Sequence, residues 1–255
     1  MNKICSNSYG KLPGFLASFD HSLLSKGPVI QEQVHDFVKK LNTKVLSEKI
    51  NGITFNSKYI KPELRGGACS AIALRIACPL LDRVKHLPSN SSWDCQADAI
   101  DFVELINKSE SIEKDQIRSV QAAFNTIIVT SEKISDISQQ KIRALAAFYD
   151  IKILYSTDEY VIEEGENFER KFLEQIKNLN QGVYLVRAIQ EADNRKKESR
   201  GHSTIYIKDK KEELYFDPRL GLYKLNEQKK VFFESIYGSK RIYNLDNIKI
   251  HLLSK

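Results

Sequence analysis

The sequence lacks the features that mark membrane-spanning, signal-bearing and repetitive proteins. Its 255 residues contain no run of about 20 apolar residues, which excludes a transmembrane helix. The opening residues, MNKICSNSYGKLPGFLASFD, have no apolar core of the roughly 7 to 15 residues that a secretory signal peptide needs. Internal repeats and low-complexity tracts are absent as well. We therefore expect a soluble, folded protein.

Cysteine is scarce, with Cys5, Cys69, Cys78 and Cys95 alone and no CxxC pair among them. This density is far below that of a disulfide-stapled secreted domain, so we expect reduced thiols. The same cysteines with His86 lack the short spacings of zinc ligands. We expect neither a metal nor a cofactor.

Hydrophobic residues make up 42% and charged residues 28% of the chain, close to the averages of globular proteins. The formal net charge is +6, carried by scattered lysines. This excess suits an acidic partner or an anionic membrane surface, although the need for solubility would also explain it. No groove-reading helix or aromatic RNA-binding motif supports a nucleic acid partner.

Two regions are expected along the chain. Residues 1–55 are interpreted as a leader, in which one amphipathic helix is predicted within residues 29–48 by apolar residues at helical spacing, namely Val34, Phe37, Val38, Leu41 and Val45. Residues 56–255 are interpreted as a single globular domain. We expect this domain to be a monomer.

The domain begins with helical patterns and continues with strand patterns. A short buried helix is predicted from Cys69, ended or kinked by Pro79. Further helices are predicted at residues 94–107, 114–124, 138–149 and 168–179, with another beginning near Val231. Strands are predicted at residues 126–129, 151–155, 182–189, 202–208, 214–217, 222–225 and 241–252. Strands that mostly follow helices favour an α+β fold with an antiparallel sheet.

A histidine and an aspartate are expected to meet in this sheet. If the strands around Ile205 and Leu214 are joined by a two-residue turn at Asp209 and Lys210, His202 lies directly opposite Asp217. Facing side chains have Cβ atoms about 4.5 to 5.5 Å apart, so the carboxylate can accept the imidazole Nδ1–H. Asp-Lys is not a preferred turn sequence, and a longer loop would shift this register.

Cys69 is the candidate nucleophile for an oriented histidine. It follows Gly66, Gly67 and Ala68 at the predicted start of a helix. The partial positive charge of a helix N-terminus favours the thiolate over the thiol. Taken alone, such a cysteine is more often a small core residue, and a lone histidine is more often structural. Only the combination with His202 and Asp217 indicates a nucleophile, a base and an orienting group.

Three sequence blocks resemble the YopT/AvrPphB-type cysteine proteases, which are bacterial effectors. The blocks are residues 65–74 (RGGACSAIAL), 200–205 (RGHSTI) and 214–221 (LYFDPRLG). The order Cys, His, Asp is that of the family, and the resemblance covers roughly residues 60–255. It implies a papain-like fold with a central nucleophile-bearing helix packed on an antiparallel sheet. It also implies Cys69 as nucleophile, His202 as general base and then acid, and Asp217 as the residue that orients His202.

One departure from the family concerns the oxyanion donor. Such enzymes usually carry Gln or Asn a few residues before the nucleophile, where this chain has Glu63 and Arg65. An ionised Glu63 has no proton to donate, so Arg65, the more distant Asn56 or the backbone N–H of Cys69 are the other candidates. Residues expected to line the substrate cleft are Gly67, Gly201, Arg195, Lys196 and Lys197.

The resemblance implies a host protein as substrate, with small GTPases and other signalling proteins among the candidates. It also implies synthesis in a bacterial cytoplasm and delivery into the host cytosol without a cleavable signal peptide. The sequence leaves two alternatives to proteolysis open. The same triad can act on a glutamine side chain as a deamidase or transglutaminase, and Glu63 in the oxyanion region would suit a non-catalytic papain-like binding module.

Overall fold

The structure is a computed structural model and describes residues 69–86, 93–108, 117, 120–121, 134–190, 201–218 and 220–255. Its helices are α3 (Cys69–His86), α4 (Cys95–Lys108), α6 (Ile134–Phe148), α7 (Glu166–Lys177) and α8 (Lys229–Tyr243). Its strands are β1 (Lys152–Ser156), β2 (Tyr160–Val161), β3 (Gly182–Ile189), β4 (Gly201–Lys208), β5 (Glu213–Asp217), β6 (Gly221–Lys224) and β7 (Asn247–Ser254). No described helix is long and apolar enough to cross a membrane.

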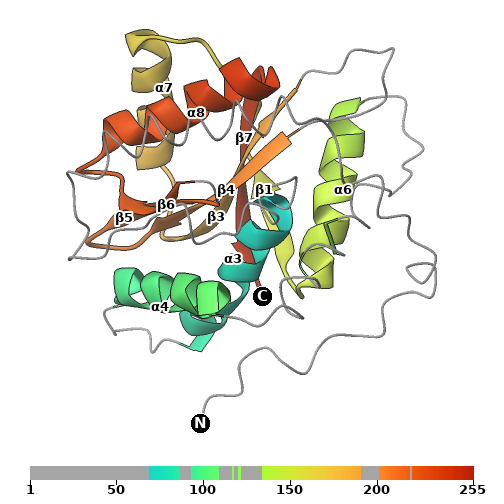
Figure 1. Cartoon of the computed structure of the whole chain (residues 1–255), viewed down its shortest axis with the longest axis vertical. Coiled ribbons are helices and arrows are strands. Elements are labelled where there is room, and N and C mark those ends of the chain that lie inside the picture. The colour runs from blue at the N-terminus through green and yellow to red at the C-terminus, as the bar shows by residue number, and fades with distance from the viewer. Residues whose placement is uncertain are drawn as a thin grey trace.

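The strands form one antiparallel sheet in the order β1-β7-β3-β4-β5-β6, and β2 also pairs with β7. The strand that comes last in the described chain, β7, thus lies between β1 and β3 (Figure 1). An antiparallel sheet with helices packed against it confirms the predicted α+β class. The boundary expected between residues 55 and 56, the helix expected within residues 29–48 and the strand expected at 126–129 lie outside the described residues.

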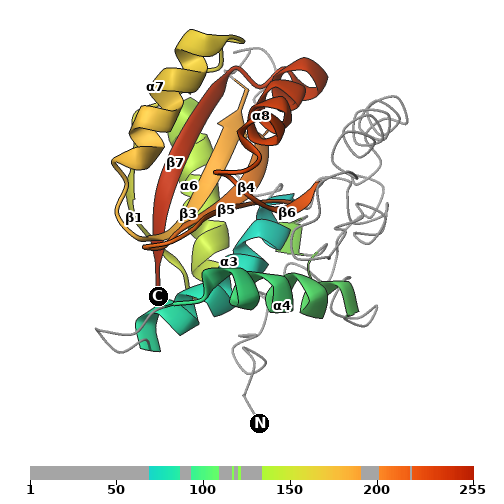
Figure 2. The same cartoon turned by 90° about the vertical axis from the view of Figure 1, so that its left-hand side faces the viewer.

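Helices cover both faces of this sheet (Figures 1 and 2). The inner residues of α3, α4 and α6 form one hydrophobic core with the β3–β6 residues Val183, Leu185, Ile205, Ile207, Leu214, Phe216 and Leu222. The inner residues of α7 and α8 form a second core with the β3–β7 residues Tyr184, Val186, Ala188, Tyr206, Tyr215, Tyr223, Ile248 and Ile250. Because strand side chains alternate between faces, these strands are buried on both sides, and β3 reads as a nearly continuous apolar run.

Helix α3 is the central buried helix, and it is longer than the sequence predicts. Residues from Ser70 to Cys78 are all buried, as expected for a helix that is apolar nearly all round. The expected end at Pro79 was wrong, because the helix continues to His86. A proline inside a helix costs about 3 kcal/mol, and burial of the next turn, including Leu80 and Leu81, offsets this cost.

The expected two-residue turn between β4 and β5 was also wrong. Asp209 accepts backbone N–H bonds from Lys211 and Glu212 at 2.5 and 2.6 Å, and its own N–H bonds the carbonyl of Glu212 at 3.1 Å. This aspartate-centred turn lengthens the loop to residues 209–212, so Ile205 pairs with Phe216 instead of Leu214. The slip is two residues, and it leaves every side chain on its predicted face because strand side chains repeat every two residues.

The last strand begins later than predicted. Residues 241–243 belong to α8, which ends at Asn244 in the left-handed conformation (φ 54°, ψ 47°). A left-handed residue terminates a helix, and β7 begins only at Asn247. The helix predicted at residues 114–124 lies mostly outside the described residues. The other predicted helices and strands within the described residues are confirmed, with boundaries that move by a few residues.

Candidate active site

His202 and Asp217 are in contact, as the sequence predicts, although the two residues do not stand directly opposite each other. His202 Nε2 lies 3.1 Å from Asp217 Oδ1, and their side chains are only 6% and 0% exposed. Because Phe216 pairs with Ile205, the antiparallel register places Asp217 opposite Thr204. Its contact with His202, two residues before Thr204, is therefore diagonal across β4 and β5. The imidazole nitrogen that faces the carboxylate is Nε2, so the contact expected through Nδ1 was wrong.

Helix α8 holds the second oxygen of Asp217. Ser235 Oγ donates to Asp217 Oδ2 at 2.6 Å, and Ser235 is itself 1% exposed. A buried carboxylate is expensive unless its oxygens are hydrogen-bonded, and here the two oxygens have different partners from different elements. The arrangement fixes the carboxylate plane and, through it, the imidazole of His202.

Cys69 opens α3 and reaches β4 at the residue before His202. Its Sγ lies 3.8 Å from the carbonyl oxygen of Gly201, and the residue is partly exposed. The next residue fixes this approach, because Ser70 Oγ lies 2.7 Å from Ser203 Oγ in a buried contact. Cys69 and Ser70 of α3 thus contact Gly201 and Ser203 of β4, the residues just before and just after His202 in the chain.

The side chain of Gln121 accepts a hydrogen bond from the first turn of α3. The backbone N–H of Ala71 donates to Gln121 Oε1 at 3.0 Å. The first N–H groups of a helix have no partner within it, and this bond satisfies one of them. The N–H of Ala71 is therefore committed, while the N–H of Cys69 remains a candidate oxyanion donor.

Several predicted site residues lie outside the described residues. These are the oxyanion candidates Glu63, Arg65 and Asn56, and the cleft candidates Gly67, Arg195, Lys196 and Lys197. Gly201 is described and is exposed at the start of β4, next to Cys69. A Cβ at this position would lie 3.1 Å from Arg187 Nη2 and 3.2 Å from the carbonyl oxygen of Ala188. The close approach of β3 explains the need for glycine here.

Sequence reasoning missed two residues at this site, Arg187 and Ser235. Arg187 is 4% exposed and stands directly opposite Ser203 in the β3–β4 pairing. Its signal was visible, because a single arginine interrupts the apolar run GVYLVRAI, and charged residues are rarely buried. Ser235 gave only a weak signal as a small polar residue on the apolar face of an amphipathic helix.

The other described cysteines have different surroundings. Cys78 is buried, and its Sγ lies 3.7 Å from the carbonyl oxygen of Tyr149. Burial, a hydrogen bond to Asp209 and neighbouring carboxylates all raise the pKa of Cys95. A thiol whose pKa is raised is a poor nucleophile at neutral pH. Cys69 and Cys95 both begin a helix, but it is Cys69 whose Sγ approaches the residue before His202.

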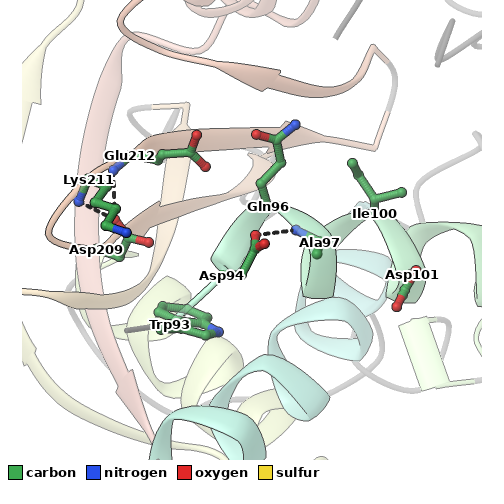
Figure 3. Close-up of a pocket in the computed structure, with 9 residues that line it drawn as sticks. All are labelled: Trp93, Asp94, Gln96, Ala97, Ile100, Asp101, Asp209, Lys211 and Glu212. Carbon is green, nitrogen blue, oxygen red and sulfur yellow. Dashed lines mark hydrogen bonds between the residues drawn. The ribbon is translucent and has the colours of Figure 1, made fainter. Parts of the chain in front are cut away.

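A cavity of about 490 Å³ lies elsewhere, between the start of α4 and the β4–β5 loop (Figure 3). Its lining is acidic, but three of its four carboxylates make local structural contacts. Asp94 Oδ1 accepts the N–H of Ala97 at the start of α4. Asp209 closes the β4–β5 turn, and Glu212 pairs with Lys224 at 2.8 Å. Local structure thus accounts for most of the acidic lining, with Asp101 as the fourth carboxylate.

Comparisons with known proteins give little more. No family model matches the sequence, and no curated protein matches it significantly. Among solved structures, the Pseudomonas avirulence protein AvrPphB is similar over 75% of this chain and 94% of its own, with a TM-score of 0.42 and 11% sequence identity. Neither the fold nor the chemistry of this chain follows from so distant a similarity.

Proposed function

We propose that this chain is a papain-like cysteine protease in which Cys69, His202 and Asp217 cleave a peptide bond through an acyl-thioenzyme. The observation that supports it most is the buried His202–Asp217 contact at 3.1 Å, beside the Gly201 carbonyl that Cys69 Sγ approaches to 3.8 Å. The sequence blocks that resemble the YopT/AvrPphB-type proteases contain these same three residues.

The proposed reaction begins with a proton transfer. Because Nε2 of His202 faces Asp217, Nδ1 is the nitrogen that takes the proton from the Cys69 thiol. The thiolate attacks the carbonyl carbon of the substrate, and the π electrons move to oxygen to form a tetrahedral oxyanion. Asp217, held by Ser235, stabilises the imidazolium that results.

The oxyanion then collapses and the peptide C–N bond breaks. The leaving nitrogen takes the proton from His202, which leaves a thioester on Cys69. A water molecule gives a proton to His202 and attacks the thioester, and the carboxylic acid departs as the thiol is restored. The N–H of Cys69, at the positive end of α3, is proposed as one group that stabilises the oxyanion.

The family resemblance extends the proposal to the biological setting. The substrate would be a host signalling protein, with small GTPases as the first class to test. The chain would be made in a bacterium and delivered into the host cytosol, where the reducing environment keeps Cys69 a thiol. The net charge of +6 is compatible with an anionic membrane surface near the substrate.

The decisive experiment compares the full chain with Cys69→Ala and Cys78→Ala on a host-cell lysate. New peptide N-termini, identified by mass spectrometry, are expected with the full chain and with Cys78→Ala, and are expected to be absent with Cys69→Ala. Cys78→Ala is the matched control, since its thiol is buried away from His202.

Identical N-termini with and without Cys69 would contradict the protease proposal. Substrates converted from Gln to Glu, or cross-linked, without new N-termini would instead show that the same residues act on a side-chain amide. Binding of a host protein without any covalent change would favour the non-catalytic module.

A further inference from the structure

Arg187 is a buried cation in the middle of an apolar sheet. Apart from Gly182 and Arg187 itself, all residues of β3 are buried and apolar. Burying a guanidinium costs several kcal/mol unless a negative or polar group compensates it. Burial lowers the pKa of Arg187 to about 10, which still leaves it charged at neutral pH, and the charge of Cys69 opposes this shift.

The guanidinium of Arg187 and the sulfur of Cys69 both lie close to Gly201. Gly201 leaves room for Arg187, since a Cβ built there would lie 3.1 Å from Nη2. The carbonyl oxygen of Gly201 is 3.8 Å from Cys69 Sγ. The register supports this placement, because Arg187 stands opposite Ser203, and Ser203 contacts the residue after Cys69.

Two further cations, Lys249 and Arg143, and the buried His251 are among the described residues near Arg187. Lys249 stands opposite Arg187 on β7 and pairs with Glu159 at 3.6 Å. His251 of β7 feels the charges of Arg187, Lys249 and Arg143 of α6, and its pKa is lowered by burial and by these charges. A negative charge on Cys69 therefore interacts with Arg187, whose own neighbours include further positive charges.

We propose that Arg187 is a positioning residue that stabilises the Cys69 thiolate from the α3 side of the sheet, while His202 serves it from the opposite face. This inference rests on the proposed function for its biological meaning, because it assigns a second source of activation to the same nucleophile. It adds that Cys69 keeps thiolate character even when His202 is neutral, which a Cys–His ion pair alone would not provide.

The test is the pH dependence of Cys69 alkylation by iodoacetamide, read on the Cys69 peptide by mass spectrometry. An opposite charge within about 4 to 6 Å shifts a pKa by about 1 to 3 units. In Arg187→Gln the alkylation midpoint should therefore rise by at least about one pH unit, and the rate at pH 6 should fall about tenfold. Arg187→Lys should retain most of the wild-type rate.

Lys249→Met is the matched control, since it removes one positive charge from the same face but away from Gly201. Its alkylation midpoint should move by less than half of the Arg187→Gln shift, on the order of 0.5 pH unit or less. Circular dichroism and thermal unfolding must show that each variant is folded. An unchanged midpoint in folded Arg187→Gln would overturn the inference.

A second variant covers the case in which Arg187→Gln does not fold. In His202→Ala, with Arg187 intact, Cys69 should still titrate below the value of about 8.5 typical of a free thiol. A midpoint at or above that value would overturn the inference. Because alkylation needs no substrate, it can confirm the role of Arg187 even if the lysate experiment refutes proteolysis.

Discussion

The two faces of the sheet differ in what they bury. The face under α7 and α8 is aromatic, with the rings of Phe168, Phe172, Tyr184, Tyr206, Tyr215, Tyr223, Phe232, Phe233 and Tyr237. The face under α3 and α6 is mainly aliphatic. Each face also buries polar residues, namely Ser70, Arg187, Ser203 and His251 on this face and His202, Thr204, Asp217 and Ser235 on the α7–α8 face.

The difference predicts that the two faces have different roles. Large rings fill space densely and bury much apolar area, so the α7–α8 face is suited to holding Asp217 through Ser235 without movement. The small residues of α3, such as Ala71 and Ala73, allow the helix to approach the sheet closely and bring Cys69 to β4. We expect stability to depend more on the aromatic face and the state of the thiol more on the aliphatic one.

The largest stability effect is expected in the aromatic face. Phe232 is 0% exposed, and its ring lies 4.5 Å from that of Tyr215 and 5.8 Å from that of Phe172. Phe232→Ala should lower the free energy of unfolding by about 3 to 5 kcal/mol, measured by urea denaturation. Phe232→Leu, the control, should cost clearly less.

The same variant tests the division between the faces. In folded Phe232→Ala the midpoint of Cys69 alkylation should move less than in Arg187→Gln, because Cys69 and Arg187 lie on the other face of the sheet while His202 shares the face of Phe232. A stability loss below about 1 kcal/mol, or a midpoint shift as large as that of Arg187→Gln, would show that the faces are not separate in this way.

The next effect concerns the bond between Ser235 and Asp217. Ser235→Ala removes a 2.6 Å hydrogen bond to a fully buried carboxylate. Hydrogen bonds to charged groups contribute about 1.5 to 3 kcal/mol, so the free energy of unfolding should fall by that amount. Ser239→Ala is the matched control, because Ser239 is equally buried and its hydroxyl donates to the backbone carbonyl of Ser235 within α8.

Activity separates positioning from packing in this pair. Once a cleaved substrate is known, Ser235→Ala should lower kcat with little change in KM, whereas Ser239→Ala should leave both near the wild-type values. Equal effects of the two variants on stability and on kcat would remove the special role of Ser235.

The smallest effect is a pH dependence on the aliphatic face. His251 is 2% exposed, and burial, followed by the charges of Arg187, Lys249 and Arg143, lowers its pKa from 6.5 to about 3. The unfolded chain binds a proton at this histidine below pH 6.5 and the folded chain does not, so stability falls as the pH drops from 6.5 towards 3. At pH 5.5 the loss should be about 1.4 kcal/mol relative to pH 8.

Urea denaturation at several pH values measures this loss. His251→Gln should flatten the slope between pH 8 and 5.5, while His86→Gln, at the exposed end of α3, should keep it. A wild-type slope that persists in His251→Gln would place its origin elsewhere.

Much of the fold could be predicted from the sequence because its elements follow local patterns. The apolar runs of β3 and β4 and the helical spacing of α7 specify those elements directly. The 209–212 loop could not be predicted in the same way, because the bonds of Asp209 to two backbone N–H groups depend on a turn geometry that the sequence does not spell out. Long-range packing likewise decided that α3 continues past Pro79.

The candidate site was predictable to a similar extent. The contact of His202 with Asp217 survived a wrong register because face alternation is insensitive to a slip of two residues. The sequence analysis assumed that His202 and Asp217 stand directly opposite each other. It therefore did not predict the diagonal contact through Nε2. Ser235 and Arg187 reach the site from α8 and β3, and their placement follows from how these elements pack.

The central position of β7 bears on how the chain acquires its structure during synthesis. Within the described sheet, β1 and β2 pair with β7 alone, so the ribosome makes them well before their partner exists. Cys69 similarly precedes its contact at Gly201 by 132 residues. Such distant contacts make folding slow and leave strand edges exposed meanwhile. A nascent chain therefore carries the cysteine long before its histidine and the strand that completes the sheet.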